Sequence, residues 1–202
     1  MVEVYQDIER RVDEAGRGFK LSLESVLQQG FNHFRRAPGP YILFSILAVL
    51  VFSNPVSGLL LGGPVTCGFY AFTRKVQREG EAEFGDFFLH FELFLPLLIL
   101  QLLISVLVSL GFLLLVIPGI YLAISYLFAQ FFVLFHGQSP TDAIRLSRRM
   151  VGGNFLQILM LCLVLMGINI LGAMAFGVGL LISMPLSACI VYAAFDDIIG
   201  IT

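Results

Sequence analysis

The sequence predicts an all-α integral membrane protein, with six transmembrane helices arranged as three hairpins that are each preceded by an amphipathic interfacial helix. Three observations support this fold class. The 202 residues are 58% hydrophobic and only 13% charged, with a mean hydropathy of +0.91, whereas soluble domains have about 25% charged residues. Three long apolar blocks each contain a turn signal. All 12 lysines and arginines lie outside these blocks.

Each apolar block is long enough for two spans. The blocks cover residues 38–73, 93–136 and 154–195, whereas one helix needs about 20 residues to cross a 30 Å core. The turn signals are Ser53-Asn54-Pro55, Ile117-Pro118-Gly119 and Phe176-Gly177-Val178-Gly179. The first block leaves only about 15–18 residues per span. The bilayer is therefore thinned there, or the spans extend into the flanking segments, or the first hairpin is re-entrant.

The positions of the basic residues predict the orientation. Six precede residue 38, three lie at 74–78 and three at 145–149. With six spans, all of these segments face the cytoplasm, as the positive-inside rule requires. The first forty residues contain no apolar core of a signal peptide. We therefore expect a multi-pass protein of the bacterial inner membrane with both termini in the cytoplasm.

Short amphipathic stretches precede the hairpins at 25–37, 84–95 and 141–154. Their spacing of about 60 residues indicates a threefold pseudo-repeat, of a kind that in transporters places binding sites at repeat interfaces. The third stretch predicts the clearest helix, with Ser139 as its N-cap and Pro140 in the first position. Gly152-Gly153 ends this helix, and Asn154 is expected to cap the next span. The second stretch is acidic, and its acids are expected to pair with arginines of the other two; they are Glu81, Glu83, Asp86 and Glu92.

The extreme N-terminus, residues 1–20, is predicted to be a separate cytoplasmic amphipathic helix, and residues 21–202 to be a single membrane domain. The apolar residues of this N-terminal helix recur at 3-4-3-4 spacing, a narrow seam of the kind that helices use to pair; they are Tyr5, Ile8, Val12, Ala15 and Phe19. This helix is expected to pack on the cytoplasmic face of the protein itself. Self-association and capture of a partner are the alternatives.

The predicted spans contain no ionisable residue, which argues against an ion-coupled pump. Their neutral polar residues either hydrogen-bond between helices or line a cavity; the cavity candidates are Asn54, Gln101, Gln130 and Asn169. Small residues spaced four apart permit close helix packing or dimerisation; they are Gly58 with Gly62 and Ala173 with Gly177. Cysteine and histidine spacings predict no metal site, no cofactor and no catalytic motif, and the net charge of −2 does not suggest nucleic acid.

Three segments give the chain a family resemblance: residues 23–39, residues 113–130, and residues 142–154 with 191–197. Over residues 20–198 the chain resembles the YciC-like proteins and the membrane domain of some glycerophosphoryl diester phosphodiesterases, which are bacterial multi-pass membrane proteins that are mostly uncharacterised. The resemblance implies a fold and a location, and no activity. No catalytic residue carries over from it.

The leading functional prediction is a non-enzymatic membrane protein with an interaction or envelope-support role. Its basic cytoplasmic face would contact anionic lipid headgroups, each arginine contributing roughly 1 kcal/mol; these arginines are Arg35, Arg36, Arg145, Arg148 and Arg149. Alternatively they only set the topology. A small transporter or facilitator of a neutral or lipidic solute is the alternative function. A protein partner or a homo-oligomer stays open, and the sequence identifies no substrate.

Overall fold

A computed structural model describes residues 2–80, 82–175 and 177–200, and for residues 2–5 and 91 it describes the backbone alone. Within these ranges the chain is helical and has no β-strand, so the predicted all-α class is confirmed. The α-helices are α1 (Val2–Gly16), α2 (Leu23–Arg36), α3 (Pro38–Phe52), α4 (Pro55–Glu79), α5 (Phe94–Leu114), α6 (Val116–Ser125), α7 (Ala129–His136), α8 (Pro140–Gly152), α9 (Phe155–Met174) and α10 (Leu180–Ile198), and the 3-10 helices are η1 (Phe84–Phe88) and η2 (Phe91–Leu93).

Five helical segments are long and apolar enough to cross a membrane. They are α4 with 25 residues, α5 with 21, α6 and α7 together with 21, α9 with 20 and α10 with 19. α3 has 15 residues and reaches the required length only together with α2, from which it is bent by 96°. The structure therefore confirms an all-helical chain whose described residues form five segments of membrane-spanning length and composition, or six if the bent pair α2–α3 is one span. α4 extends beyond its apolar block into the basic connector, whereas α3 remains short.

Three helix pairs reverse direction close to the predicted turns. At the first turn, Asn54 caps α4 by accepting a hydrogen bond from the Val56 N–H at 2.9 Å. In the third pair, Gly177 adopts a φ of 76°, which favours glycine; Phe176 lies outside the described residues. The second turn falls at Leu115, two residues before the predicted signal. Pro118 instead occupies the first turn of α6, where a missing N–H costs little because those groups have no partner within the helix.

The second half of the middle pair is broken, which the sequence did not predict. α6 ends at Ser125 and α7 begins at Ala129. A break leaves carbonyl groups at the helix end without partners in the helix. The hydroxyl of Ser147 on α8 donates a hydrogen bond of 2.7 Å to the Ser125 carbonyl. The break is therefore stabilised by the neighbouring helix.

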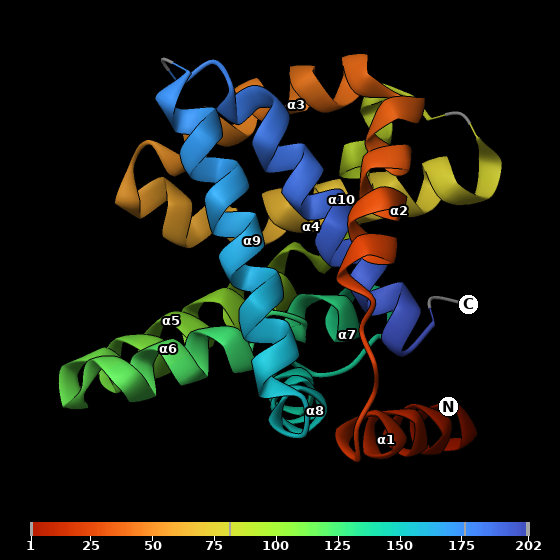
Figure 1. The fold of residues 1–202 in the computed structure, drawn as a ribbon, viewed down its shortest axis with the longest axis vertical. Helices are drawn as coiled ribbons and strands as arrows, with labels where there is room; N and C mark the ends of the chain where they lie inside the picture. Colours follow the sequence, from red (N-terminus) through yellow and green to blue (C-terminus); the bar gives the residue numbers. More distant parts are fainter. Residues whose placement is uncertain (1, 81, 176, 201–202) are drawn as a thin grey trace.

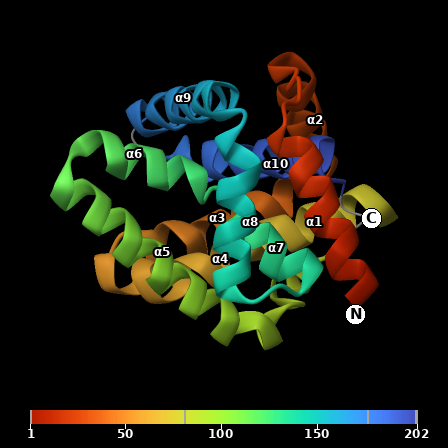
Figure 2. The ribbon, with the colours of Figure 1, turned by 90° about the horizontal axis from the view of Figure 1, so that it is seen from below.

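The three pairs form a closed ring. The first helix of each pair contacts the second helix of the pair before it: α5 contacts α4, α9 contacts α6, and α3 contacts α10. The element preceding each pair follows the same order, because α2 packs on α10, η1 on α4, and α8 on α6 and α7. In Figures 1 and 2 the three turns lie at the left of the molecule and both chain ends at the right. The predicted threefold repeat is therefore present as a repeat of contacts.

The middle amphipathic stretch is not the single helix that the sequence predicts. It forms two 3-10 turns, η1 and η2. A 3-10 helix has three residues per turn and places residues i and i+3 on one side. The rings of Phe84 and Phe87 both reach Phe44 of α3, with centroids 6.2 and 4.0 Å away. Packing against α3 thus favours the tighter turn over an α-helix.

The second helices of the pairs meet in an aromatic core. Tyr70 of α4 stacks on Phe131 of α7 with centroids 4.1 Å apart, and Phe131 stacks on Phe195 of α10 at 4.6 Å. Phe131 and Phe195 are fully buried. Tyr41 of α3 and Thr73 of α4 join this core through a 2.8 Å hydrogen bond between their hydroxyls. Close-packed rings at this position fill the space between the three pairs.

α1 packs along α8, as its narrow seam predicted. Ile8, Val12 and Ala15 are buried, and the side chain of Tyr5 lies outside the described residues. The Asn154 amide donates to the Ala15 carbonyl at 2.8 Å and accepts from the Phe19 N–H at 3.0 Å. The prediction that the Asn154 side chain caps α9 is therefore wrong, because that amide holds the end of α1 instead.

Candidate functional site

α8 presents three arginines on its outer side. Ser139 caps the helix by accepting from the Asp142 N–H at 3.2 Å, and Pro140 begins it, as predicted. One face is fully buried against the protein; it comprises Ala143, Leu146, Ser147, Met150 and Val151. Because an α-helix has 3.6 residues per turn, Arg145, Arg148 and Arg149 project from the opposite side, and all three are exposed.

These arginines line an open groove. Its volume is about 480 Å³. Tyr121 and Tyr126, from α6 and the break after it, form the facing wall, and Gly152-Gly153 forms one end. Tyrosines beside arginines offer an apolar surface together with hydrogen-bond donors, a combination found at membrane interfaces. The groove can therefore accept a negatively charged group that is attached to an apolar body.

Two of the three arginines bind carboxylates of α1. Arg145 lies 3.2 Å from Glu9 and 3.0 Å from Asp142, and Arg149 lies 3.0 Å from Asp13. For Arg148, no carboxylate lies within ion-pair distance in the part of the chain that the structure describes. Among the described residues, Arg148 is thus the arginine of this groove that has no ion pair.

The predicted pairing of the acidic stretch with arginines of the other two amphipathic stretches is wrong for Asp86. Asp86 instead binds Lys75 of α4 at 2.8 Å, and η1 packs on α4. Burial by itself would raise the pKa of Asp86, but the hydrogen bonds from Lys75 and from the Glu83 N–H outweigh it and lower that pKa. Glu81 lies outside the described residues. The ion pair between Asp86 and Lys75 therefore holds η1 against α4.

Arg35 and Arg36 form a separate basic group at the end of α2. Both are exposed, and the Arg35 guanidinium lies 5.6 Å from the centroid of the Phe31 ring. Gly30 lets α2 approach α10 closely, since a Cβ there would lie 2.7 Å from the Ile190 Cα. Figure 1 places this end of α2 at the top of the molecule and α8 at the bottom. The five predicted headgroup contacts therefore fall into two groups.

The neutral polar residues of the spans mostly join helices to one another. Gln130 of α7 donates to Gln101 of α5 at 3.4 Å. Asn169 of α9 donates to Ser187 of α10 at 2.7 Å. Asn54 is exposed at the first turn and caps α4. Of the four predicted cavity residues, the structure thus brings Gln101 and Gln130 together, while Asn169 has different partners and Asn54 lies away from both.

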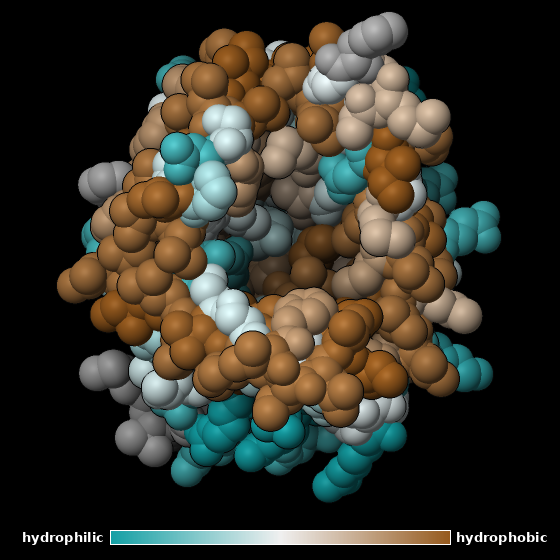
Figure 3. All heavy atoms as spheres, turned by 90° about the vertical axis from the view of Figure 1, so that its left-hand side faces the viewer, coloured by the Kyte–Doolittle hydropathy of each residue, from teal (hydrophilic) through white to brown (hydrophobic). Residues whose placement is uncertain are grey.

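The side of the ring that carries the turns is hollow. Figure 3 looks onto this side and shows a hydrophobic rim around a central depression in which hydrophilic side chains are visible. A cavity of about 340 Å³ between the first and third pairs is lined by Thr66, Asn169 and Ser187 among apolar neighbours. Tyr70, which stacks on Phe131, also lines it. The aromatic core therefore lies directly beneath this cavity.

A model of a protein family matches residues 31–198, which include all three helix pairs; it is described as DUF7847, a domain of unknown function. The chain belongs to the DUF7847 family. No curated protein and no solved structure matches the chain significantly. Since the match begins within α2, the DUF7847 domain contains the α8 groove and the hollow, whereas α1 lies before it.

Four small residues were predicted to allow close packing of helices, and two of them make such contacts in this DUF7847 domain. In the first pair, Gly62 faces the Phe52 ring, which a Cβ would approach to 3.0 Å, and Gly58 faces the same ring. In the third pair the predicted residues do not pack the two helices together, because Ala173 is exposed and Gly177 forms the turn. The alternative of dimerisation stays a prediction. Gly172 and Gly179 make the close approach instead.

Histidines and cysteines of this DUF7847 domain do not assemble into a metal site. No group of three or more potential ligands lies within binding distance in residues 2–80, 82–175 and 177–200. The three cysteines are free thiols. His33 packs edge-on against the Tyr192 ring at 5.9 Å, whereas His90 lies between η1 and η2. The sequence did not predict what surrounds His90, which is an apolar pocket.

Proposed function

We propose that this protein is a non-enzymatic, multi-pass protein of the bacterial inner membrane that binds anionic lipid headgroups in the α8 groove. Its role would be an interaction or envelope-support role at the cytoplasmic face. In this proposal the three helix pairs cross the bilayer as hairpins with both termini in the cytoplasm, and α2 and α8 lie in the interface. A relation to the YciC-like proteins is part of the same proposal.

Two features support the orientation. The three turns, at residues 53–54, at residue 115, and at residues 175 and 177–179, lie together on the side away from both chain ends (Figures 1 and 2). None of the turns contains a lysine or arginine, whereas cytoplasmic loops are enriched in them. The exposed apolar side chains of α5 and α9 would then face lipid, where they have no need of a protein partner.

The lipid proposal rests on the position of Arg148. It lines the groove without a carboxylate partner among the described residues, beside the rings of Tyr121 and Tyr126. An anionic headgroup would balance its charge while the tyrosines and the apolar side of α6 contact the acyl chains. A basic residue near an anionic surface contributes about 1 kcal/mol, which corresponds to roughly fivefold in binding.

The test is retention of anionic lipid by Arg148→Gln. The purified protein would be placed in nanodiscs that contain equal amounts of an anionic and a neutral phospholipid. The protein would then be released from the nanodiscs, and the lipids that stay bound to it would be counted by native mass spectrometry. We expect Arg148→Gln to lose about fivefold in the ratio of anionic to neutral lipid. Arg35→Gln removes the same charge from the other basic group and should change the ratio less. Equal losses in the two variants would contradict a headgroup site at α8.

A facilitator of a neutral or lipidic solute is the second candidate, and the hollow favours it. Asn169, Ser187 and Thr66 would offer hydrogen bonds to a solute in the cavity of about 340 Å³. The stacked rings of Tyr70 and Phe131 would have to separate for passage. The test is solute uptake into proteoliposomes that contain the wild type or Tyr70→Ala. Faster uptake with Tyr70→Ala than with the wild type would support this function. Uptake equal to that of empty liposomes for both the wild type and Tyr70→Ala would exclude it for the solute tested.

A further inference from the structure

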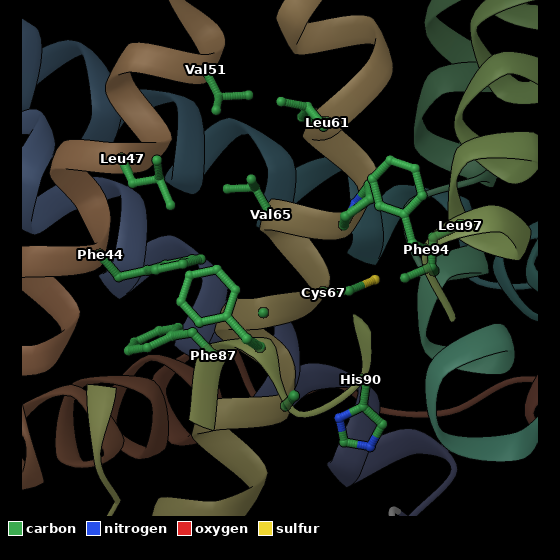
Figure 4. Close-up of a pocket in the computed structure, with 14 residues that line it drawn as sticks. Phe44, Leu47, Val51, Leu61, Val65, Cys67, Phe87, His90, Phe94 and Leu97 are labelled. Atoms are coloured by element: carbon green, nitrogen blue, oxygen red, sulfur yellow. The ribbon is translucent and has the colours of Figure 1, made fainter. Parts of the chain in front are cut away.

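An apolar pocket lies between α3, α4, the η1–η2 segment and the start of α5 (Figure 4). It encloses about 200 Å³, more than an engineered cavity of about 150 Å³ that binds benzene. Every residue that lines it is apolar except His90. The space therefore suits a hydrocarbon group with one polar atom at a defined end.

The inner wall of this pocket is preformed. The ring of Phe87 stacks on Phe44 and on Phe72, with centroids 4.0 Å apart in both cases. Gly68 lets the η1 backbone reach α4, because a Cβ there would lie 2.9 Å from the Phe87 carbonyl oxygen. Phe72 is fully buried and Phe87 nearly so. A ligand would therefore meet fixed ring faces and lose little affinity to rearrangement of the protein.

His90 marks the polar end of the pocket. Figure 4 shows its ring at the lower edge of the cavity, and its Nδ1 atom is buried with no hydrogen-bond partner among the described residues. A buried polar atom without a partner costs about 1–3 kcal/mol. Burial, and then the nearby charge of Arg74, lower the pKa of His90, so the imidazole is neutral at neutral pH. A neutral imidazole pairs well with a hydroxyl group, which both donates and accepts.

The pocket continues along the protein as an open apolar groove. Leu61 and Phe94 line both the pocket and this groove, which runs between α4 and α5 as far as Val56 and Asn54 at the first turn. From Val56 to Ala71, α4 rises about 22 Å at ~1.5 Å per residue. One leaflet of a bilayer provides about 15 Å, half of the hydrocarbon thickness. The combined path is therefore longer than one leaflet.

We propose that the pocket and groove bind a single long hydrocarbon chain that ends in a hydroxyl group, a long-chain alcohol whose hydroxyl pairs with His90 and whose chain follows α4 past Leu61 toward Asn54. The occupant comes from the bilayer, because Leu61 and Phe88 at the rim are themselves exposed apolar side chains. The inference shares the bilayer placement of the proposed function but is independent of the α8 groove.

The experiment is photolabelling of the full chain in nanodiscs of neutral phospholipid. The probe is a long-chain alcohol that carries a diazirine in its chain, and the labelled peptides are mapped by mass spectrometry. We expect label on the η1–η2 segment and on α4, reduced by unlabelled long-chain alcohol. Val65→Trp, which fills the pocket, should reduce the label at least tenfold. Leu163→Trp, an equal substitution at an exposed position of α9, should not reduce it.

The pairing of the hydroxyl group with His90 has its own test. His90→Phe should still take up the chain but lose the preference for the alcohol over the matching alkane as competitor. Equal labelling of Val65→Trp and Leu163→Trp would overturn the site, and a fatty acid that competes better than the alcohol would overturn the hydroxyl assignment. Leu61→Trp, at the rim, repeats the test if Val65→Trp does not fold. Arg148→Gln should leave this labelling unchanged, so a failure of the α8 proposal can be distinguished from a failure of the alcohol site.

Discussion

At the residue scale, a few polar side chains fix the positions of whole elements. Asn154 holds the end of α1, Ser147 satisfies the carbonyl at the α6 break, and Asp86 ties η1 to Lys75. Each of these residues binds a backbone or charged group of a neighbouring element. Their loss would expose the backbone or charge that they satisfy, which is costlier than losing an exposed contact.

Replacing Asn154 by alanine should destabilise the protein by about 1–3 kcal/mol, because the Phe19 N–H loses its acceptor. The Ala15 carbonyl keeps only its hydrogen bond from the Gly18 N–H. Thermal unfolding in detergent would measure the change. Asn154→Asp keeps an acceptor for Phe19 but places a buried carboxylate oxygen against the Ala15 carbonyl oxygen, so its unfolding temperature should be no higher than that of Asn154→Ala. An alanine variant as stable as the wild type would show that α1 is held by its apolar seam alone.

Asp86 should make stability depend on pH in the acid range. Its pKa is lowered from an ordinary value of 3.8, so the ion pair with Lys75 is fully present above that value and is lost as the pH falls through the lower, folded-state pKa. The difference in unfolding temperature between the wild type and Asp86→Asn should be constant around neutral pH and shrink below about pH 4. A difference that persists unchanged in strong acid would contradict this assignment.

At the element scale, α1 covers the basic side of α8. It places Glu9 and Asp13 on Arg145 and Arg149, while Ile8, Val12 and Ala15 of its apolar seam are buried. Exposed ion pairs of this kind contribute only about 0–1 kcal/mol, so a lipid phosphate can compete with these carboxylates for the arginines. α1 therefore acts as an internal competitor of the ligand that we propose for the groove.

Neutralising the two acids should strengthen the binding of anionic lipid. In Glu9→Gln/Asp13→Asn, Arg145 loses its ion pair with Glu9 and Arg149 loses its ion pair with Asp13. Retention of anionic lipid should rise, by up to about fivefold for the ion pair at Arg149. Asp7→Asn/Glu14→Gln is the matched control, since those acids pair with Arg11 and Arg10 within α1 and their removal changes the net charge equally. The same rise in both variants would indicate a general charge effect.

At the scale of the whole molecule, the ring of three pairs accounts for both the aromatic core and the hollow. α4, α7 and α10 converge on the rings of Tyr70, Phe131 and Phe195. The side of the ring that carries the turns has a central depression (Figure 3). Exposed apolar side chains dominate α5 and α9. Such a surface would be unstable in water and is matched by a bilayer.

Labelling of single cysteines tests the hairpin arrangement. On a cysteine-free background, Asn54→Cys, Leu115→Cys and Ala175→Cys should react with an impermeant maleimide in intact spheroplasts. Gly80→Cys and Gly137→Cys should react only after permeabilisation, because the basic connectors remain inside. Reaction of Gly80→Cys from outside would mean that the first pair does not return to the cytoplasm, and the proposed orientation would have to be abandoned.

The sequence by itself determined the helical class, the three pairs and two of their turns, because apolar length, turn residues and the Ser139 cap are local properties. It also placed α8 and the outward side of its arginines. Only the tertiary structure decided their partners: Glu9 and Asp13 lie some 136 residues from Arg145 and Arg149, a distance along the chain that no periodicity reveals. The 3-10 form of η1, the break after Ser125 and the pocket at His90 likewise depend on packing between elements, where contacts with distant residues outweigh local preference.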